Sequence, residues 1–293
     1  YSDGLTLVDT LNVADLADEV AHGYTWSNRE RLDGFATEVY EFTDARGLPV
    51  LDGGRRINGE ESFTLRTLPN QDALLITRVH PYDGGTFDVF ANSLRVSQRM
   101  VPVERGRWLE ILTIIPSVLI MDETVTIRIV PHVNGGHYMP YHHWLYSGTL
   151  AHDIPPQTSI AQYQDGAIHL VDAVAQVEAG QVIVTLTWWG DGQAQGDWVR
   201  FVHLYEDLNA PPVAQVDTRP LDGHYTPSNW VMGTFVEQVA VQLPDMVSDT
   251  LQLAVGFYHP TTFERLSPVS VQPDLTVESG RLLLGSVETK ARD

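Results

Sequence analysis

The sequence predicts an all-β protein built from two β-sandwich domains. Three observations support this. Short apolar segments alternate with turn residues, only one segment has helical periodicity, and a Pro155-Pro156 pair interrupts the chain near its middle. A chain of 293 residues also has the length of about two ordinary domains. We expect domains at 1–154 and 155–293, joined by an extended connector around Asp153–Thr158.

Composition excludes several classes of protein. The chain has 18 basic and 38 acidic residues, a net charge of −20, and no Cys. Disulfides, thiolate metal sites and Cys nucleophiles are therefore excluded, and the charge argues against a nucleic-acid partner. Residues 1–155 carry 12 basic and 21 acidic side chains (12 − 21 = −9), and residues 156–293 carry 6 and 17 (6 − 17 = −11). Neither half is a basic binding arm.

No run of uncharged apolar residues reaches the ~20 that a membrane-spanning helix needs. The nearest approach, Ile111–Met121, is interrupted by Pro116 and Ser117. The chain does not begin with Met, so we expect a processed product or an excised piece, with any signal or membrane anchor upstream.

The first half has four clear strand candidates and one helix. Val13, Leu16, Ala17 and Val20 recur with helical spacing, which predicts a helix of two or three turns. An Asp83-Gly84-Gly85 turn separates the first two of the strands, which are Ala73–Val79, Thr86–Ala91, Trp108–Ile115 and Val125–Val130.

The second half has seven strand candidates with turn signals between them. These are Ile168–Val174, Val182–Trp188, Val199–Tyr205, Val213–Asp217, Phe235–Leu243, Leu251–Tyr258 and Leu282–Val287. Seven short strands at this spacing predict an immunoglobulin-like or fibronectin-like sandwich. Alternation along the strands predicts a core of Trp188, Phe201, Val202, Leu204, Val241, Leu253, Val255 and Phe257.

Several segments of the second half carry a family resemblance. They are Val184–Trp188, Val199–Leu204, Val213–Gln215 with Asp217 and Pro220, Tyr225–Trp230, Gly256–Pro260 with Glu264–Leu266, and Leu283–Val287. Over about 165–288 the chain resembles a β-sandwich module at the extracytoplasmic end of bacterial multi-pass glycosyltransferase-like membrane proteins. The sequence departs from that pattern at His259, where Asp is usual, and at Phe263, where Gly is usual.

The first half resembles a galactose-binding-type jelly roll through Arg78, Gly85–Val89, Trp108 and the Val125–Val130 strand. The two resemblances together imply an extracytoplasmic location and a membrane-associated assembly. The catalytic region of the transferases is absent from this chain, so the two resemblances imply no transferase activity.

These observations predict a non-catalytic module that binds a glycan or a protein partner, or that serves as a structural subunit. The alternative is a glycan-active hydrolase or lyase with a site near 132–144. No GxSxG, P-loop or GxGxxG motif is present. We expect the adjacent acids Glu60-Glu61 to lie on a solvated face.

The stretch His132–Trp144 is rich in His and aromatic residues. Imidazole is the commonest metal ligand, so His137, His142 and His143 are candidates for one Zn²⁺ or Cu²⁺ site. Tyr138, Tyr141 and Trp144 are candidates for stacking on sugar rings. The simpler interpretation is a loop and an edge strand whose aromatic side chains cap the domain.

The pair Trp188-Trp189 places its two rings on opposite faces of a strand. We expect Trp188 in the core and Trp189 outward beside Asp191, where both are candidates for ligand contact. No cofactor is predicted. Asp52-Gly53-Gly54, Asp83-Gly84-Gly85 and Asp191-Gly192 offer carboxylates that suit a structural Ca²⁺, although Asp-Gly is primarily a turn signal.

Overall fold

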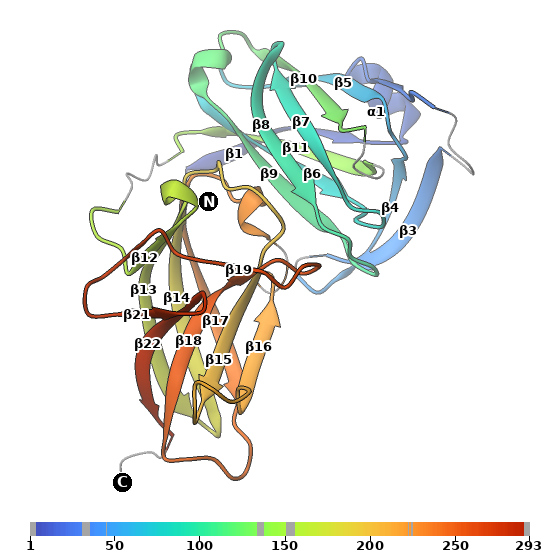
Figure 1. Cartoon of the computed structure of the whole chain (residues 1–293). Helices are drawn as coiled ribbons and strands as arrows, with labels where there is room; N and C mark the ends of the chain where they lie inside the picture. Colours follow the sequence, from blue (N-terminus) through green and yellow to red (C-terminus); the bar gives the residue numbers. More distant parts are fainter. Residues whose placement is uncertain are drawn as a thin grey trace. The chain divides into compact units, whose positions relative to one another are not determined.

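The computed structural model describes residues 4–30, 36–44, 46–133, 138–150, 156–221, 223 and 225–289. The chain divides into two compact units, unit 1 (residues 1–151) and unit 2 (residues 152–293). Both are β-sandwiches, as the alternating sequence predicts (Figure 1). Residues 153–155 of the expected connector lie outside the described residues. No described helix has the length and apolar character needed to cross a membrane.

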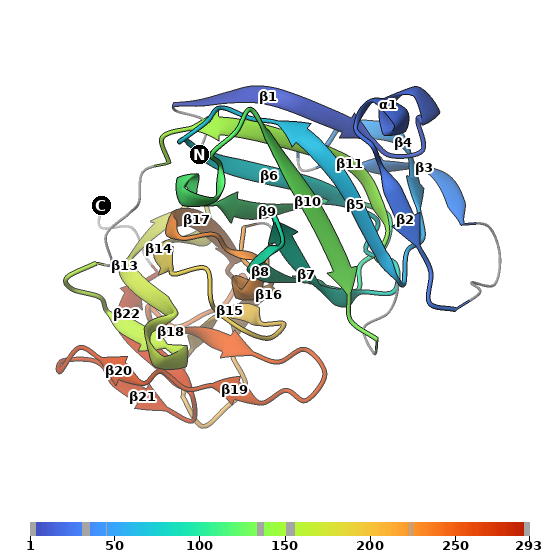
Figure 2. The ribbon, with the colours of Figure 1, turned by 90° about the horizontal axis from the view of Figure 1, so that it is seen from above.

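Unit 1 consists of two main sheets and a separate hairpin, layered as Figure 2 shows. The first sheet has the order β1-β11-β6-β9, with β1 (Leu5–Asn12), β11 (Pro140–Gly148), β6 (Asp72–Val79) and β9 (Leu109–Ile115). The second sheet has the order β2-β5-β10-β7-β8, with β2 (Thr25–Ser27), β5 (Glu60–Arg66), β10 (Thr124–Pro131), β7 (Gly85–Ala91) and β8 (Leu94–Val101). The hairpin pairs β3 (Thr37–Thr43) with β4 (Pro49–Arg55), and a 3₁₀ turn, η1 (Ser117–Leu119), follows β9.

The core of unit 1 follows from strict alternation along its strands. Val125, Ile127 and Ile129 of β10 are fully buried, whereas Thr126 is exposed. Because side chains alternate along a strand, one side of each strand faces the space between the two sheets. All four expected strands of unit 1 are present, with ends displaced by one residue.

The turn at Asp83–Gly85 connects two sheets instead of closing a hairpin. Strand β6 pairs with β9 and β11, whereas β7 pairs with β8 and β10. Gly84 and Gly85 have φ values of +67° and +145°, which residues with a Cβ rarely adopt. The glycines therefore let the chain leave one sheet and enter the other.

Helix α1 (Leu16–Ala21) is present, but it faces the opposite way from the expectation. Leu16 and Val20 are 71% and 82% exposed, while Glu19 is buried. The Glu19 carboxylate accepts two hydrogen bonds from Arg55, at 2.7 and 2.8 Å. Because this ion pair lies under the helix, its apolar residues point outward.

Unit 2 is a sandwich of two sheets. One sheet has the order β17-β14-β13-β12-β20, with β17 (Gly233–Gln242), β14 (Gln181–Gly190), β13 (Ile168–Glu178), β12 (Ala161–Tyr163) and β20 (Ser270–Val271). The other has the order β16-β15-β18-β22-β21, with β16 (Ala214–Thr218), β15 (Val199–Tyr205), β18 (Thr250–Tyr258), β22 (Arg281–Glu288) and β21 (Thr276–Glu278), and β19 (Arg265–Leu266) pairs with β18. Two 3₁₀ turns are η2 (Gln164–Gly166) and η3 (Pro227–Asn229).

The expected core of unit 2 is confirmed, since all eight residues predicted for it are at most 4% exposed. Seven of them join one apolar cluster between the sheets. The eighth, Phe201, lies buried outside that cluster, and the Arg265 guanidinium is 5.4 Å from the centre of its ring.

The turn between β18 and β19 contains His259 and Phe263, the two positions at which the sequence departs from the module that it resembles. The His259 Nδ1 atom accepts the backbone N–H groups of Thr261 and Thr262, each at 3.3 Å, as an Asp carboxylate would. Phe263 has a φ of +59°, the left-handed conformation that favours glycine. The turn forms with a backbone strain that a Gly would not have.

Candidate functional site

A cluster of aromatic rings surrounds His80, the first residue after β6. The ring of His80 is 4.7 Å from that of Tyr40, 4.8 Å from Phe42 and 5.7 Å from Tyr82, between ring centres. Trp108 packs edge-on against Phe42, with 5.1 Å between ring centres. We call Tyr40, His80 and Tyr82 the tyrosine surface, because Tyr40 and Tyr82 remain 37% and 43% exposed while His80 is buried.

The hairpin β3–β4 forms one side of this surface. Tyr40 and Phe42 lie on β3, and their rings stack at 5.2 Å. Strand β4 approaches closely at Gly54, where a Cβ would lie 2.5 Å from the Tyr141 ring. The Trp108 indole N–H also donates to the Val50 carbonyl, at 2.9 Å. These contacts hold the hairpin, and with it Tyr40, in place.

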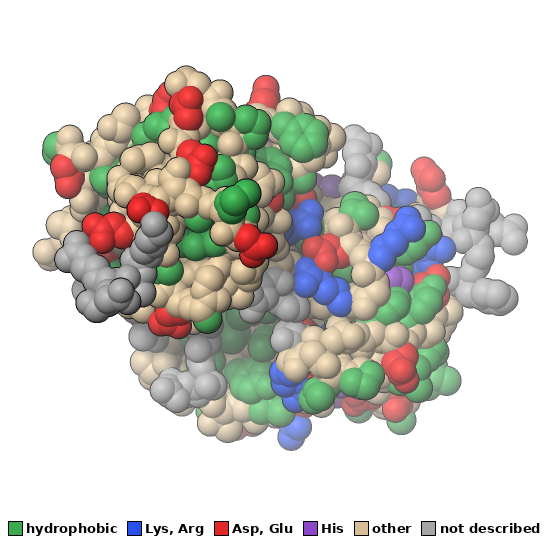
Figure 3. Space-filling view, turned by 90° about the horizontal axis from the view of Figure 1, so that it is seen from below, with side chains coloured by type: hydrophobic (Ala, Val, Ile, Leu, Met, Phe, Trp, Pro, Cys, Tyr) green, Lys and Arg blue, Asp and Glu red, His purple; other side chains and the backbone are tan. Residues whose placement is uncertain are grey.

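Charged side chains lie at the rim of the tyrosine surface. The Arg56 guanidinium is 3.8 Å from the Glu38 carboxylate and 3.9 Å from the Asp83 carboxylate. The Arg105 guanidinium lies 4.9 Å from the centre of the Tyr82 ring. In the space-filling view, arginine, acidic and His side chains gather close together on part of one face (Figure 3). Hydrogen-bond donors and acceptors thus stand beside two partly free rings.

His80 is neutral at physiological pH. Burial is the main cause that lowers its pKa to about 4, with the Asp83 charge opposing this shift and the Arg56 charge adding to it. Its Nδ1 atom has no hydrogen-bond partner among the described residues. Burial and the neighbouring Glu38 raise the pKa of Tyr40, so its phenol keeps its proton and can donate. The surface presents neutral rings and charged edges.

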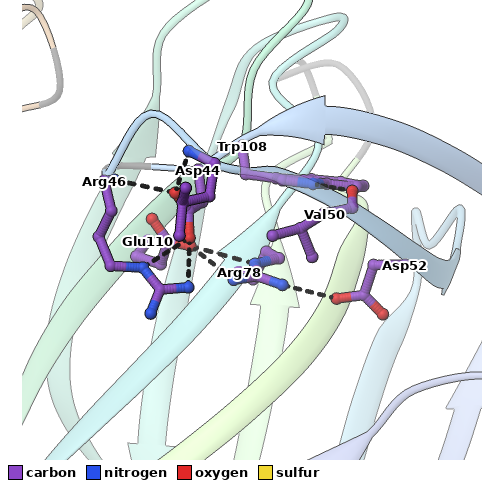
Figure 4. A network of polar contacts seen from close by, with 8 residues as sticks. Asp44, Arg46, Val50, Asp52, Arg78, Trp108 and Glu110 are labelled. Carbon is purple, nitrogen blue, oxygen red and sulfur yellow. Dashed lines mark hydrogen bonds and ion pairs between the residues drawn. The ribbon is translucent and has the colours of Figure 1, made fainter.

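An ion-pair network supports the cluster from the outer face of the first sheet (Figure 4). Arg78 of β6 donates to Glu110 of β9 at 3.0 Å and to Asp52 of β4 at 3.0 Å. Burial raises the pKa values of Glu110 and Asp52, and Arg78 partly opposes this. The Arg78 guanidinium also lies 5.9 Å from the centre of the Trp108 ring and 4.9 Å from the centre of the Trp144 ring. The network ties β4 to β6 and β9.

The structure corrects the expectation of an edge strand within 132–144. Strand β11 lies between β1 and β6, so both of its edges are paired. Tyr138 and Tyr141 are 3% and 0% exposed, and neither has the free ring face that the sugar-stacking prediction needs. Tyr138 packs on Phe87 at 4.7 Å, and Tyr141 packs on Trp108 at 4.5 Å. Both tyrosines therefore serve the packing of unit 1.

His142 and His143 do not meet. They are neighbours on β11, so their side chains point to opposite faces. His142 stacks on Trp144 at 4.2 Å, and burial lowers its pKa to about 4, with His143 and Arg78 adding to the effect. No group of three potential metal ligands occurs in the described part of the chain, and the third expected ligand, His137, lies outside it.

Trp144 is half-buried on the outer face of β11. Its ring contacts both His142 and the Arg78 guanidinium. Of the three aromatic candidates in 132–144, it alone is not fully buried, and its role in binding stays a prediction.

The expectation of an outward, free Trp189 is wrong. Trp189 is 3% exposed, and the ring of His169 covers it edge-on at 5.0 Å. His169 is its direct partner on β13, so strand pairing places the two side chains on one face. Asp191, expected beside it as a ligand contact, accepts the Gln193 backbone N–H at 2.6 Å and so closes a local turn.

The carboxylates proposed for Ca²⁺ are engaged by nearby groups. Asp52 accepts from Arg78, and Asp83 faces Arg56. Asp52-Gly53-Gly54 is part of strand β4 and not a turn. Gly54 is needed there because a Cβ at this position would overlap Tyr141.

The expectation that Glu61 is solvated is also wrong. Glu61 is fully buried, and its carboxylate accepts hydrogen bonds from the phenols of Tyr24 and Tyr138, each at 2.8 Å. His143 Nε2 lies 3.3 Å from the same carboxylate. Burial and the Glu61 charge raise the pKa values of both tyrosines well above normal, so both phenols remain donors. The cluster is a polar network inside the core, in which both tyrosines donate to the Glu61 carboxylate.

Sequence reasoning missed the tyrosine surface. Tyr40 lies in a strand that was not predicted, and Tyr82 lies just before the predicted Asp83-Gly84-Gly85 turn, where no element was predicted. The one available signal was His80-Pro81-Tyr82, two rings beside a proline directly before the Asp83 turn.

Comparison with known proteins assigns no family. No family model matches the chain, and no curated protein matches it. Among solved structures, a glycosyl hydrolase family 2 member from Bacteroides cellulosilyticus is 11% identical, covering 73% of this chain and 28% of the other, with a TM-score of 0.25. A putative beta-galactosidase from Bacteroides fragilis is 11% identical, covering 77% and 34%, with a TM-score of 0.25.

Ruminococcus gnavus beta-glucuronidase is 10% identical, covering 86% of this chain and 47% of the other, with a TM-score of 0.24. This chain thus spans less than half the length of each of these enzymes. Similarity at this level is too low to assign an activity or a site.

Proposed function

We propose that the chain is a non-catalytic binding module that binds neutral glycans at the tyrosine surface of unit 1. The observation that carries the proposal is the pair of partly exposed rings, Tyr40 and Tyr82, packed on the same neutral His80. Packing against one buried ring fixes both tyrosines at little entropic cost on binding. Each ring keeps exposed surface, which the C–H face of a sugar can cover.

The rim supplies the polar half of sugar recognition. Arg56 presents a planar set of donors, and Glu38 and Asp83 present acceptors beside it. Hydroxyl groups at the edge of a stacked sugar can bond to both kinds of group. A few polar groups around an apolar contact are typical of small-ligand sites.

Charge favours neutral ligands. The chain carries −20, and two of the rim side chains are carboxylates. The resulting field opposes the approach of uronic acids or sulfated sugars. A single open surface buries little area, so we expect weak binding of short oligosaccharides and stronger binding of polymers that engage several copies.

We propose that this binding takes place outside the cytoplasm, in a membrane-associated assembly. The support for this context is the resemblance of residues 165–288 to an extracytoplasmic module of membrane proteins.

The test is saturation-transfer NMR on the full chain, with gluco-, galacto- and manno-oligosaccharides at millimolar concentration. Tyr40→Ala and Tyr82→Ala should each weaken binding several-fold, because an aromatic contact contributes about 0.5–1.5 kcal/mol beyond the area it buries. Tyr82→Phe should retain binding, because it keeps the ring. Phe263→Ala removes an exposed aromatic ring of unit 2 and should change nothing. Absence of saturation transfer to every sugar, or undiminished transfer in the double Ala variant, would refute the proposal.

A further inference from the structure

Unit 2 has an open groove between the edge strands of its two sheets. Strand β12 covers β13 only at Ile168–Leu170, and β21 covers β22 only at Arg281–Leu283. Among the described residues, no strand pairs with the outer edge of β13 at 172–178 or of β22 at 284–287. The space between these two edges has a volume of about 420 Å³, within the range of ligand pockets.

Small residues keep this groove open. Ala173 and Ala175 of β13 pair with Leu186 and Val184 of β14, which are fully buried in the core. The two alanines face the same core but are only half-buried, so the interior of the sandwich reaches the surface here.

Gly285 leaves the third gap. It pairs with Leu253, a core residue, and so occupies an inward position without a side chain. A bulge in β22 gives it a φ of +103°, and a Cβ built there would meet nothing within 4 Å. The groove therefore has no side chain larger than a methyl group at three inward positions, 173, 175 and 285.

We propose that an extended segment of a partner polypeptide docks in this groove by adding a strand to β13. The free edge from Asp172 to Glu178 offers backbone donors and acceptors over seven residues, about 23 Å of strand. Side chains on one face of the incoming strand fill the space above Ala173, Ala175 and Gly285, and the other face points to solvent.

The charges around the groove define the partner further. Its lining contains one titratable residue, Glu288, and β13 carries Asp172 and Glu178 at the two ends of its free edge. Residues 156–293 carry 6 basic and 17 acidic side chains (6 − 17 = −11). The incoming strand should therefore alternate apolar and polar residues and carry basic residues at its ends.

The same charges disfavour a second copy of this chain. Antiparallel pairing of two β13 strands centred on Ala175 would place Asp172 of each copy directly opposite Glu178 of the other. Like charges directly opposite on paired strands are destabilising, and charged edges are a common device against self-association. The acidic residues thus favour a basic strand and disfavour a second copy of this chain.

The experiment measures fluorescence anisotropy of a labelled peptide of alternating valine and threonine with a lysine at each end. The full chain should bind it saturably. Ala175→Leu should weaken binding by about tenfold or more, because the larger side chain takes the space of the guest. Val174→Leu, on the opposite face of the same strand, should leave binding unchanged. A peptide with glutamate ends should bind less well, and salt should reduce that difference.

Ala173→Val supplies a second groove-filling variant if Ala175→Leu fails to fold. Lack of saturable binding by the lysine-ended peptide, or equal affinity in the folded groove-filling variants, would overturn the proposal. Light scattering could also show that the parent chain is a dimer and that Ala175→Leu converts it to a monomer. This result would assign the groove to a second copy of the chain and would overturn the proposal of a different partner polypeptide. The tyrosine surface lies in unit 1, so failure of glycan binding leaves this test unaffected.

Discussion

Replacement of Trp188 by alanine tests how unit 2 is held together. Trp188 is fully buried and packs against Phe257 at 5.0 Å and Trp230 at 6.1 Å. Its indole N–H also donates to the Glu237 carboxylate at 2.9 Å, and Arg200 binds the same carboxylate at 3.2 Å. Truncation leaves a cavity and removes one donor from a buried charge.

The magnitude follows from these contacts. Removing a buried aromatic side chain costs about 3–5 kcal/mol, and the lost charged hydrogen bond places Trp188→Ala near the upper end, about 5 kcal/mol. With a urea dependence of about 2 kcal/mol per molar, the unfolding midpoint of unit 2 should fall by about 2.5 M. Trp188→Phe keeps most of the packing and should cost less than half as much.

The assay is urea unfolding followed by hydrogen-exchange mass spectrometry of peptides from β14 and β18, which report on unit 2 alone. This choice matters because a chain of two domains need not unfold in one step. Met246→Ala, at a side chain that is 92% exposed, should change the free energy of unfolding by less than about 0.5 kcal/mol. A Trp188→Ala midpoint equal to that of the Met246→Ala control would refute the reasoning.

Three further changes have defined outcomes. Arg78→Met leaves two buried carboxylates without their partner and should destabilise unit 1 by about 3–5 kcal/mol in urea unfolding. Arg128→Met, which breaks an ion pair with Glu60 whose two side chains are 37% and 50% exposed, should cost less than about 1 kcal/mol. Burial lowers the pKa of His80 from 6.5 to about 4, so as pH falls His80 is protonated in the unfolded chain before it is protonated in the folded one. Unit 1 should therefore lose stability as pH falls from 6.5 to 4. Melting curves of His80→Gln should show a smaller loss over the same pH range. Phe263→Gly relieves the strain of a residue with a φ of +59° and should raise the stability of unit 2 by about 0.5 kcal/mol. An unchanged or lower melting temperature would contradict the claim that Phe263 is strained.

The strands of unit 2 were predictable because they are long and alternate regularly. Seven candidates correspond to β13 to β18 and β22, with ends shifted by a few residues. The short strands β12, β19, β20 and β21 have two or three residues each, too few for a period to show. They exist because neighbouring strands offer them an edge.

Exposure of particular aromatic residues could not be predicted from period alone. The period of two correctly separates Trp188 from Trp189, but it says nothing about what covers the outer ring. His169 covers Trp189 because the register of β13 against β14 sets them side by side. Register depends on tertiary pairing, which a local pattern does not contain.

The tyrosine surface was missed for a related reason. Tyr40, His80 and Tyr82 come from a hairpin strand and an inter-sheet loop, and only the fold of unit 1 brings them together. Gly54 was interpreted as a turn residue, although its glycine is required by the close approach of β4 to Tyr141. A glycine needed for space and a glycine needed for φ are identical in a sequence.

The most direct test of the glycan-binding proposal is an amide chemical-shift map of the full chain during titration with the oligosaccharide that gives the strongest saturation transfer. The proposal predicts that shifts concentrate at residues 38–42, 80–84 and 104–106, around Tyr40 and Tyr82. Shifts concentrated on β11 around Trp144, or in unit 2 around Trp189, would contradict it.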